Sequence, residues 1–158
     1  MHLTIVRHAH AGHKREWTGP DLERPLDDLG WRQTTALTEL LDAHVVSRIV
    51  SSPAVRCLQT VAALAERRDV AVETWLELGP DGSASRVATA CFGNPAFADA
   101  VLCTHGEVLS ELLRRPDIAR AAARHDPGRD ALLTKGSAWR LGVRLDGTVS
   151  SLTHLLPG

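Results

Sequence analysis

Short apolar runs and longer amphipathic segments follow one another along the chain. The apolar runs are typical of buried strands and lie at residues 2–6, 45–50, 70–75 and 100–103. Between them, apolar residues recur every three or four positions, as they do on the buried face of a helix. These amphipathic segments lie at residues 28–43, 53–65 and 108–113. The pattern therefore predicts strands that alternate with helices.

Three polar segments interrupt this pattern. Residues 7–27 are rich in Gly, Pro and charged residues, which predicts a long loop, and structureless loops of that length usually carry function. Residues 76–97 are ambiguous, with a weak helix expected around Arg86–Cys91. Residues 115–136 are expected to form a second polar excursion.

The chain ends in a hairpin pattern. Apolar and polar residues alternate over Ser137–Leu145 and Thr148–Leu155, on either side of the turn-forming pair Asp146-Gly147. Together with the preceding strands and helices, this predicts an α/β fold: three layers, with a mainly parallel open sheet flanked by helices and a C-terminal antiparallel hairpin. Residues 1–158 are expected to form a single domain.

Composition excludes several classes of protein. The formal net charge is −1, which gives no basic face for a nucleic acid polymer. No apolar run is long enough to cross a bilayer, so no membrane association is expected, and no signal peptide is visible. Cys57, Cys91 and Cys103 form no CxxC pair and are expected to be reduced, buried thiols of a cytoplasmic protein.

Arginine and histidine residues follow three of the predicted strands. Arg7-His8 follows the first strand. Ser51–Pro53 follows the second, with Ser52 expected as N-cap and Pro53 as first residue of a helix that carries Arg56 one turn on. Thr104–Gly106 follows the fourth. Because the carboxyl ends of parallel strands share one edge of the sheet, these residues are expected to converge beside helix N-termini and bind phosphate. Taken singly, Arg56 is equally compatible with a solvated helix charge, and His105 with a satisfied core histidine.

Four motifs resemble those of the histidine phosphatase superfamily, also called phosphoglycerate-mutase-like, and occur in the family's order. Arg7-His8-Ala9 resembles its Arg-His-Gly signature with Ala for Gly, and residues 24–33 (RPLDDLGWRQ) resemble its second segment with Asp27 for Thr. Residues 51–60 (SSPAVRCLQT) and 101–106 (VLCTHG) resemble its second arginine and second histidine motifs. The resemblance runs from residue 2 to about residue 155.

Within that superfamily the chain is most similar to two groups. Its short length and the Arg24-Pro25-Leu26 form resemble SixA-type phosphohistidine phosphatases. Arg56-Cys57, Cys103-Thr104 and Lys135–Trp139 resemble the phosphatase-like domain at the C-terminus of some two-domain MutT/Nudix proteins. No Nudix box is present, so this chain is expected to be a stand-alone version or an excised domain, with a Nudix domain as a possible partner in relatives.

The resemblance implies a mechanism. His8 would be the nucleophile that forms a phosphohistidine, kept neutral because Arg7 and Arg56 depress its pKa. Arg7, Arg56 and His105 would hold the phosphoryl oxygens, so that neither a metal nor another cofactor is needed. Thr104 and Gly106 are expected to contribute to the same binding site.

The general acid departs from the family pattern. Larger members place a Glu after the third strand, whereas this chain has Leu78 at that spacing. Glu77 is the tentative acid, Asp81 is an alternative, and either is also compatible with a plain solvated carboxylate. A weak acid favours leaving groups that depart easily, which predicts phosphohistidine protein or phosphoanhydride and nucleotide substrates over sugar monophosphates. A mutase reaction is disfavoured for the same reason.

Other interpretations of the first loop remain open. Arg24 is expected to guide or bind an anionic substrate, and His10 to lie near the pocket mouth, although a solvated charged loop is an equal alternative. His8, His10 and His13 lack the frame of a metal site, so no metal is expected. The partner is then a phosphorylated small molecule or a phosphohistidine protein. The alternative to an enzyme is a catalytically weak phosphate-binding or regulatory domain.

Overall fold

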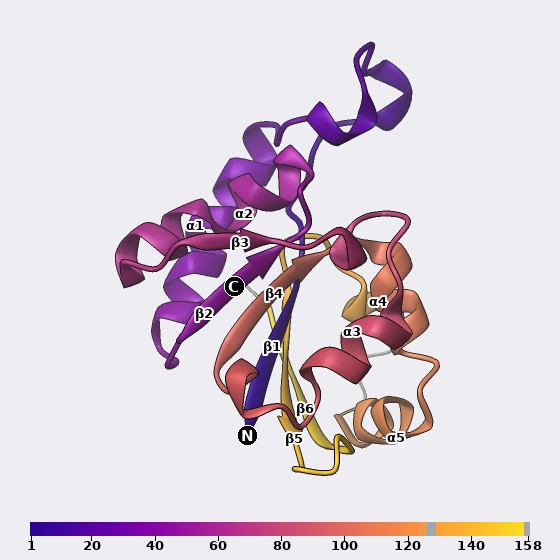
Figure 1. The fold of residues 1–158 in the computed structure, drawn as a ribbon. Coiled ribbons are helices and arrows are strands. Elements are labelled where there is room, and N and C mark those ends of the chain that lie inside the picture. Colours follow the sequence, from indigo (N-terminus) through magenta and orange to yellow (C-terminus); the bar gives the residue numbers. More distant parts are fainter. Residues whose placement is uncertain (126–128, 157–158) are drawn as a thin grey trace.

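A single six-stranded sheet forms the centre of the computed structural model, which describes residues 1–125 and 129–156 (Figure 1). The strand order is β3-β2-β4-β1-β5-β6. The first four strands pair in parallel and the last two are antiparallel, as the sequence predicts. The strands are β1 (His2–Arg7), β2 (Arg48–Ser51), β3 (Val72–Thr74), β4 (Ala100–Thr104), β5 (Ala138–Val143) and β6 (Val149–Leu155).

Helices cover both faces of the sheet, which confirms the three-layer α/β prediction. The helices are α1 (Asp28–Asp42), α2 (Val55–Arg68), α3 (Ala84–Cys91), α4 (Gly106–Leu112), α5 (Pro116–His125) and α6 (Arg129–Leu132). In Figure 1, α1 and α2 lie on one side of the strands, and α3, α4 and α5 lie on the other. Four single-turn 3-10 helices lie in the described connections: η1 (Lys14–Glu16), η2 (Asp21–Glu23), η3 (Leu76–Leu78) and η4 (Pro95–Phe97).

Each face of the sheet has its own apolar core. Leu37 and Leu41 of α1 pack with α2 residues against Ile49 and Val101. On the opposite face, Leu109 of α4 and Ile118 of α5 pack with α3 against Leu3, Ile5 and Leu102. The alternate direction of side chains along each strand divides the apolar residues of β1 and β4 between the two cores. Both faces of the central strands are therefore buried, which fixes the edge where their carboxyl ends meet.

The start of α2 corrects the sequence prediction. Ala54 is its N-cap, and the helix begins at Val55 rather than at Pro53. The Ser52 hydroxyl accepts from Ala54 N at 3.2 Å and contacts His105 Nε2 at 2.8 Å, so it belongs to a turn and to the histidine instead of capping the helix. The physical reason is a competing partner, His105, which follows β4 and is distant in sequence, so the local pattern does not contain it.

Two other segments are more helical than predicted. The predicted polar excursion at 115–136 contains α5 and α6; residues 126–128 lie outside the described residues. Ile118 and Ala121 of α5 are buried at helical spacing, but the apolar stripe is short and charged residues such as Asp117 and Arg120 lie beside it in the sequence. The weak helix predicted at Arg86–Cys91 begins earlier, at Ala84, where the Ser83 side chain caps it. Over residues 1–125 and 129–156, the structure contains no helix of the length and apolarity that a membrane span requires.

Candidate active site

The strand register brings the three Arg- and His-bearing segments to one edge of the sheet. Arg7 at the end of β1 pairs with Thr104 at the end of β4, and Ser51 of β2 pairs with Cys103. The backbone continues this link past the strand ends, because His8 N donates to the Thr104 carbonyl at 3.1 Å. The predicted residues therefore lie at one edge of the sheet. His8, the candidate nucleophile, is hydrogen-bonded to the residue that precedes His105.

The His8 ring is oriented for attack through Nε2. Its Nδ1 lies 2.7 Å from the Ala9 carbonyl oxygen, and a carbonyl only accepts hydrogen bonds, so Nδ1 carries the proton and Nε2 keeps its lone pair. The residue is 5% exposed. Burial lowers the pKa of His8 to about 3, with His105, Arg56 and Arg7 lowering it further and the bond to Ala9 opposing the shift. The imidazole is neutral at physiological pH, as nucleophilic attack requires.

His105 lies beside His8, and a hydrogen-bond network orients it. The two rings meet edge to face with centroids 5.1 Å apart. His105 Nδ1 accepts from Arg56 Nη2 at 3.3 Å, which places the proton on Nε2, where it donates to Ser52 Oγ at 2.8 Å. The Nδ1 edge of the ring thus faces Arg56, and Ser52 holds the opposite edge. In this tautomer Ser52 accepts the one ring N–H, so a hydrogen bond from His105 to an anion at Arg56 stays a prediction.

The Arg7 guanidinium lies against backbone from two other segments. Its Nη1 donates to the Leu133 carbonyl, and Gly106 lies directly behind it. A Cβ at Gly106 would be 2.9 Å from both Arg7 Cζ and Nη2, so a side chain at this position would displace the Arg7 guanidinium. Gly106, which the sequence predicts as a substrate-binding residue, packs its backbone against the Arg7 guanidinium. Burial lowers the pKa of Arg7, with Glu107 opposing that shift.

Arg56 is buried and carries an ion pair with the first loop. Its side chain is 4% exposed, and Nη2 lies 3.0 Å from Asp21 Oδ2 while Nη1 donates to the Asp21 carbonyl at 2.8 Å. The Nε atoms of both Arg56 and Arg7 are buried without a hydrogen-bond partner among the residues that the structure describes. Buried donors are costly unless paired, so the two unpartnered N–H groups point to an anionic ligand at this site.

The segment before β5 belongs to the site, although the sequence analysis gave it no role there. Gly136 N lies 3.2 Å from the carbonyl oxygens of both Arg7 and His8, so this segment binds the nucleophile-bearing turn directly. Burial lowers the pKa of Lys135, and the positive charges of Arg7 and Arg24 lower it further. Lys135 is therefore a further cation of this positive region. In the sequence, Lys135 was marked only as part of the Lys135–Trp139 motif that resembles the phosphatase-like domain of MutT/Nudix proteins.

Three predicted substrate-binding residues make structural contacts. The fully buried Thr104 hydroxyl donates to the Leu78 carbonyl at 2.6 Å and so joins β4 to η3. Arg24 is buried and donates to the carbonyl of Ala11 at 2.6 Å and to the Asp21 carboxylate. His10 Nδ1 lies 2.6 Å from Asp27, the N-cap of α1. The bonds of Arg24 and His10 brace the first loop, and direct contact of the three residues with substrate stays a prediction.

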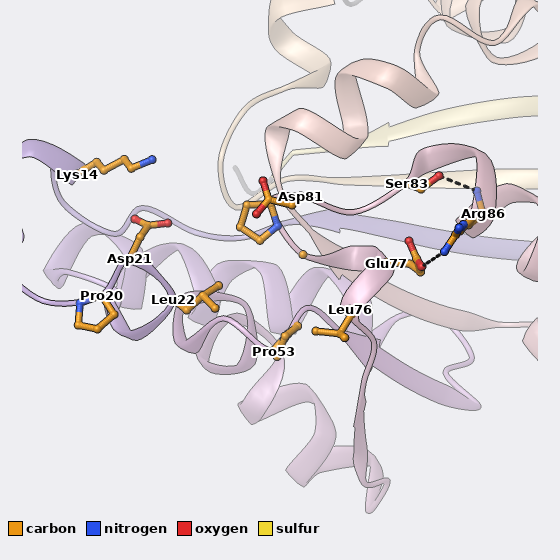
Figure 2. A pocket seen from close by; sticks show the side chains of 12 residues that line it. Lys14, Pro20, Asp21, Leu22, Pro53, Leu76, Glu77, Asp81, Ser83 and Arg86 are labelled. Atoms are coloured by element: carbon orange, nitrogen blue, oxygen red, sulfur yellow. Dashed lines mark hydrogen bonds and ion pairs between the residues drawn. The ribbon is translucent and has the colours of Figure 1, made fainter.

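A cleft of ≈ 920 Å³ lies between the first loop and the segment that contains η3 (Figure 2), and neither Arg7 nor Arg56 is among its lining residues. Asp21 connects the cleft to Arg56, because it lines the former and binds the latter. Glu77, the tentative acid, lies on the cleft wall and pairs with Arg86 at 3.0 Å, while Asp81 lines the wall nearby. The lining residues are Lys14, Pro20, Asp21, Leu22, Pro53, Leu76, Glu77, Gly79, Pro80, Asp81, Ser83 and Arg86.

Comparisons with known proteins agree with this geometry. The model of the histidine phosphatase superfamily (branch 1) matches residues 3–79. The 8-oxo-(d)GTP phosphatase of Mycolicibacterium smegmatis is 30% identical over 161 residues, which cover 98% of this chain and 48% of that protein. The chain thus spans about half the length of this relative.

Solved structures of similar fold cover the whole chain. The structure of the protein histidine phosphatase SixA with tungstate superposes with a TM-score of 0.78 at 19% identity, covering 99% of this chain and 97% of that one. A SixA structure from Nakamurella multipartitia superposes with a TM-score of 0.64 at 26% identity, covering 98% and 97%. The motifs, the superfamily match over residues 3–79 and the shared fold agree: the chain is similar to the histidine phosphatase superfamily and has the fold of its members.

Proposed function

We propose that this protein is a phosphatase that acts without a metal, through a phosphohistidine intermediate on His8. The observation that carries the proposal is the His8 ring, whose Nδ1–H is fixed by the Ala9 carbonyl while Nε2 keeps a lone pair. Beside it, Arg7 and Arg56 hold buried N–H groups without partners among the described residues. A neutral nucleophile next to two fixed cations is suited to attack on a phosphoryl group.

The proposed reaction has two steps. His8 Nε2 forms a bond to phosphorus while the bond from phosphorus to the leaving group breaks, and the leaving group keeps the electron pair. Arg7, Arg56 and His105 bind the phosphoryl oxygens and stabilise the charge that they carry in the transition state. Water then forms a bond to phosphorus while the bond from phosphorus to Nε2 breaks and its electron pair returns to Nε2. The water gives up a proton to solvent, inorganic phosphate is released, and neutral His8 is regenerated. The cationic side chains take the role that a metal has in other phosphatases.

We propose phosphohistidine protein or phosphoanhydride and nucleotide substrates. One support is the tentative acid position: the apolar Leu78 stands at the family's spacing, and the neighbouring Glu77 is held in an ion pair with Arg86 at 3.0 Å. Further support is the likeness to SixA and to the 8-oxo-(d)GTP phosphatase, although that relative is about twice as long. The binding partner in this proposal is a phosphorylated small molecule or a phosphohistidine protein. We also propose a cytoplasmic location. In relatives of this chain, a Nudix domain is the proposed partner.

The test measures turnover and the intermediate together. The wild-type chain and a His8→Ala variant would be assayed with p-nitrophenyl phosphate, in the presence and absence of EDTA. We expect EDTA-insensitive turnover and an acid-labile phosphoenzyme in the wild type, with both lost in the variant. Turnover that survives in His8→Ala would contradict the proposal. Phosphate binding without turnover on any phosphorylated substrate would instead support a regulatory domain.

A substrate panel addresses the second half of the proposal. Phosphohistidine protein, nucleoside diphosphates and triphosphates, and sugar monophosphates would be compared by kcat/KM. We expect the sugar monophosphates to be the poorest, because their alkoxide leaving groups need a proton that this site supplies badly. If sugar monophosphates are clearly the best substrates, the argument from a weak acid is wrong.

A further inference from the structure

A carboxylate from the first loop lies on the phosphate-binding arginine. Asp21 Oδ2 is 3.0 Å from Arg56 Nη2, and Asp21 Oδ1 is 3.1 Å from Arg24 Nε. The contact is fixed from both sides, because the Asp21 carbonyl also accepts from Arg56 Nη1 at 2.8 Å and from Arg24 N at 3.1 Å. The position of the carboxylate is therefore set by η2 and does not depend on a flexible side chain.

The bonds of Arg56 place a bound phosphoryl group close to this carboxylate. Three N–H groups of the guanidinium are engaged, two by Asp21 and one by His105. The buried Nε–H has no partner among the described residues and remains available for a phosphoryl oxygen. A phosphoryl group bound there shares one guanidinium with Asp21, so the two anions are neighbours.

Asp21 stays charged at this position. Burial raises its pKa, but the charges and hydrogen bonds of Arg56 and Arg24 outweigh burial and hold the pKa below its usual value. The same carboxylate lines the adjacent cleft, as Figure 2 shows. A leaving group that extends from Arg56 past Asp21 into this cleft would meet a fixed negative charge.

The other charged residues of the cleft do not neutralise the charge of Asp21 beside Arg56. Glu77 and Asp81 add negative charge to the opposite wall, while Lys14 and Arg86 add positive charge. Arg86 is paired with Glu77 at 3.0 Å and is largely exposed. Among the carboxylates that line the cleft, Asp21 makes the ion pair with Arg56.

We propose that Asp21 determines leaving-group specificity by disfavouring leaving groups that carry negative charge next to the transferred phosphoryl group. This inference rests on the proposed phosphatase function. It ranks neutral and cationic leaving groups, such as those of phosphoramidates, above the phosphate that leaves from pyrophosphate and above the nucleoside monophosphate that leaves from a nucleoside diphosphate. Arg56 thus binds the reacting phosphoryl group and also pairs with Asp21, the residue that selects the leaving group.

A matched series of aryl phosphates tests the charge effect. Phenyl phosphates with 3-methyl, 3-carboxymethyl and 3-aminomethyl groups differ in charge but little in leaving-group basicity. With Asp21→Asn, we expect kcat/KM for the carboxymethyl compound relative to the methyl compound to rise about ten-fold, as for charges ~6 Å apart at an effective dielectric constant of ~40. For the aminomethyl compound the same ratio is expected to fall. General changes in phosphate affinity cancel in these ratios.

Controls separate charge, shape and the underlying chemistry. Asp81→Asn removes the same charge from the cleft wall and is expected to shift the ratios much less. Asp21→Glu keeps the charge and is expected to retain the wild-type ratios, which also covers the case in which Asp21→Asn folds poorly. Unchanged ratios in Asp21→Asn, or equal shifts in Asp81→Asn or in Asp21→Glu, would overturn the inference. Turnover retained in His8→Ala would instead overturn the proposed function, whatever the ratios.

Discussion

Replacement of His8 by asparagine should remove a pH dependence from the stability of the protein. The His8→Asn variant keeps an N–H group that can donate to the Ala9 carbonyl but has no titratable ring. In the wild type, burial lowers the pKa of His8 to about 3, helped by His105, Arg56 and Arg7. In the unfolded chain the same histidine titrates at about 6.5.

The sign and size of the effect follow from these two values. As pH falls below about 6.5, the unfolded chain takes up a proton at His8 that the folded protein refuses until about pH 3, so the free energy of unfolding decreases. At about pH 5 this decrease is ~2 kcal/mol, and it depends almost only on the unfolded pKa. At about pH 7.5 it is close to zero, because the residue is neutral in both states.

Urea denaturation of both proteins at about pH 5 and about pH 7.5 measures this difference. We expect the wild type to lose ~2 kcal/mol more than His8→Asn between the two conditions. The other histidines titrate in both proteins and cancel from the comparison. If the two proteins lose the same stability within ~0.5 kcal/mol, His8 titrates normally in the fold, and the argument for a buried neutral nucleophile fails.

Three further substitutions test contacts of the site. Gly106→Ala places a methyl group 2.9 Å from Arg7 Cζ. We expect kcat/KM to fall at least ~ten-fold while the far-UV circular dichroism stays unchanged. Unaltered kinetics would contradict the contact. Ser52→Ala removes the acceptor for His105 Nε2–H and is expected to lower kcat by ~ten-fold, the kinetic equivalent of one buried hydrogen bond, with KM little changed. Asp27→Ala removes the N-cap of α1 and is expected to lower the free energy of unfolding by ~1 kcal/mol, measured in urea; a loss under ~0.3 kcal/mol would show that the cap is replaced.

The location of the site followed from the sequence because it depends on short-range pattern and one topological rule. Apolar runs that end in Arg7 or in Thr104 show where strands stop, and parallel strands place those ends together. The hairpin followed in the same way from alternation around Asp146-Gly147. These features are local, so no knowledge of distant contacts was needed.

The features that the sequence did not predict depend on contacts between distant segments. Asp21 and Arg56 are 35 residues apart, and their bond depends on a single 3-10 turn without a strong signal. Ser52 has the residue type of a helix cap, but its hydroxyl contacts His105, 53 residues away, and so the helix starts later. Lys135 joins the site because Gly136 binds the turn after β1. Each contact is decided by packing, which a local pattern does not contain.

The two halves of the site are held by different kinds of structure, and this bears on how specificity can change. His8 and His105 extend directly from the paired strands β1 and β4 and are almost fully buried, so a change near them disturbs the sheet. Asp21 and Leu76, on the cleft side, lie on single-turn helices in loops, and Leu76 is 81% exposed. Substitution of an exposed loop residue such as Leu76 costs little stability, whereas substitution of Asp21 also removes a partner of the buried Arg56. A fold of this kind can therefore keep one phosphoryl chemistry while the loop residues, Asp21 first among them, change the leaving group that it accepts.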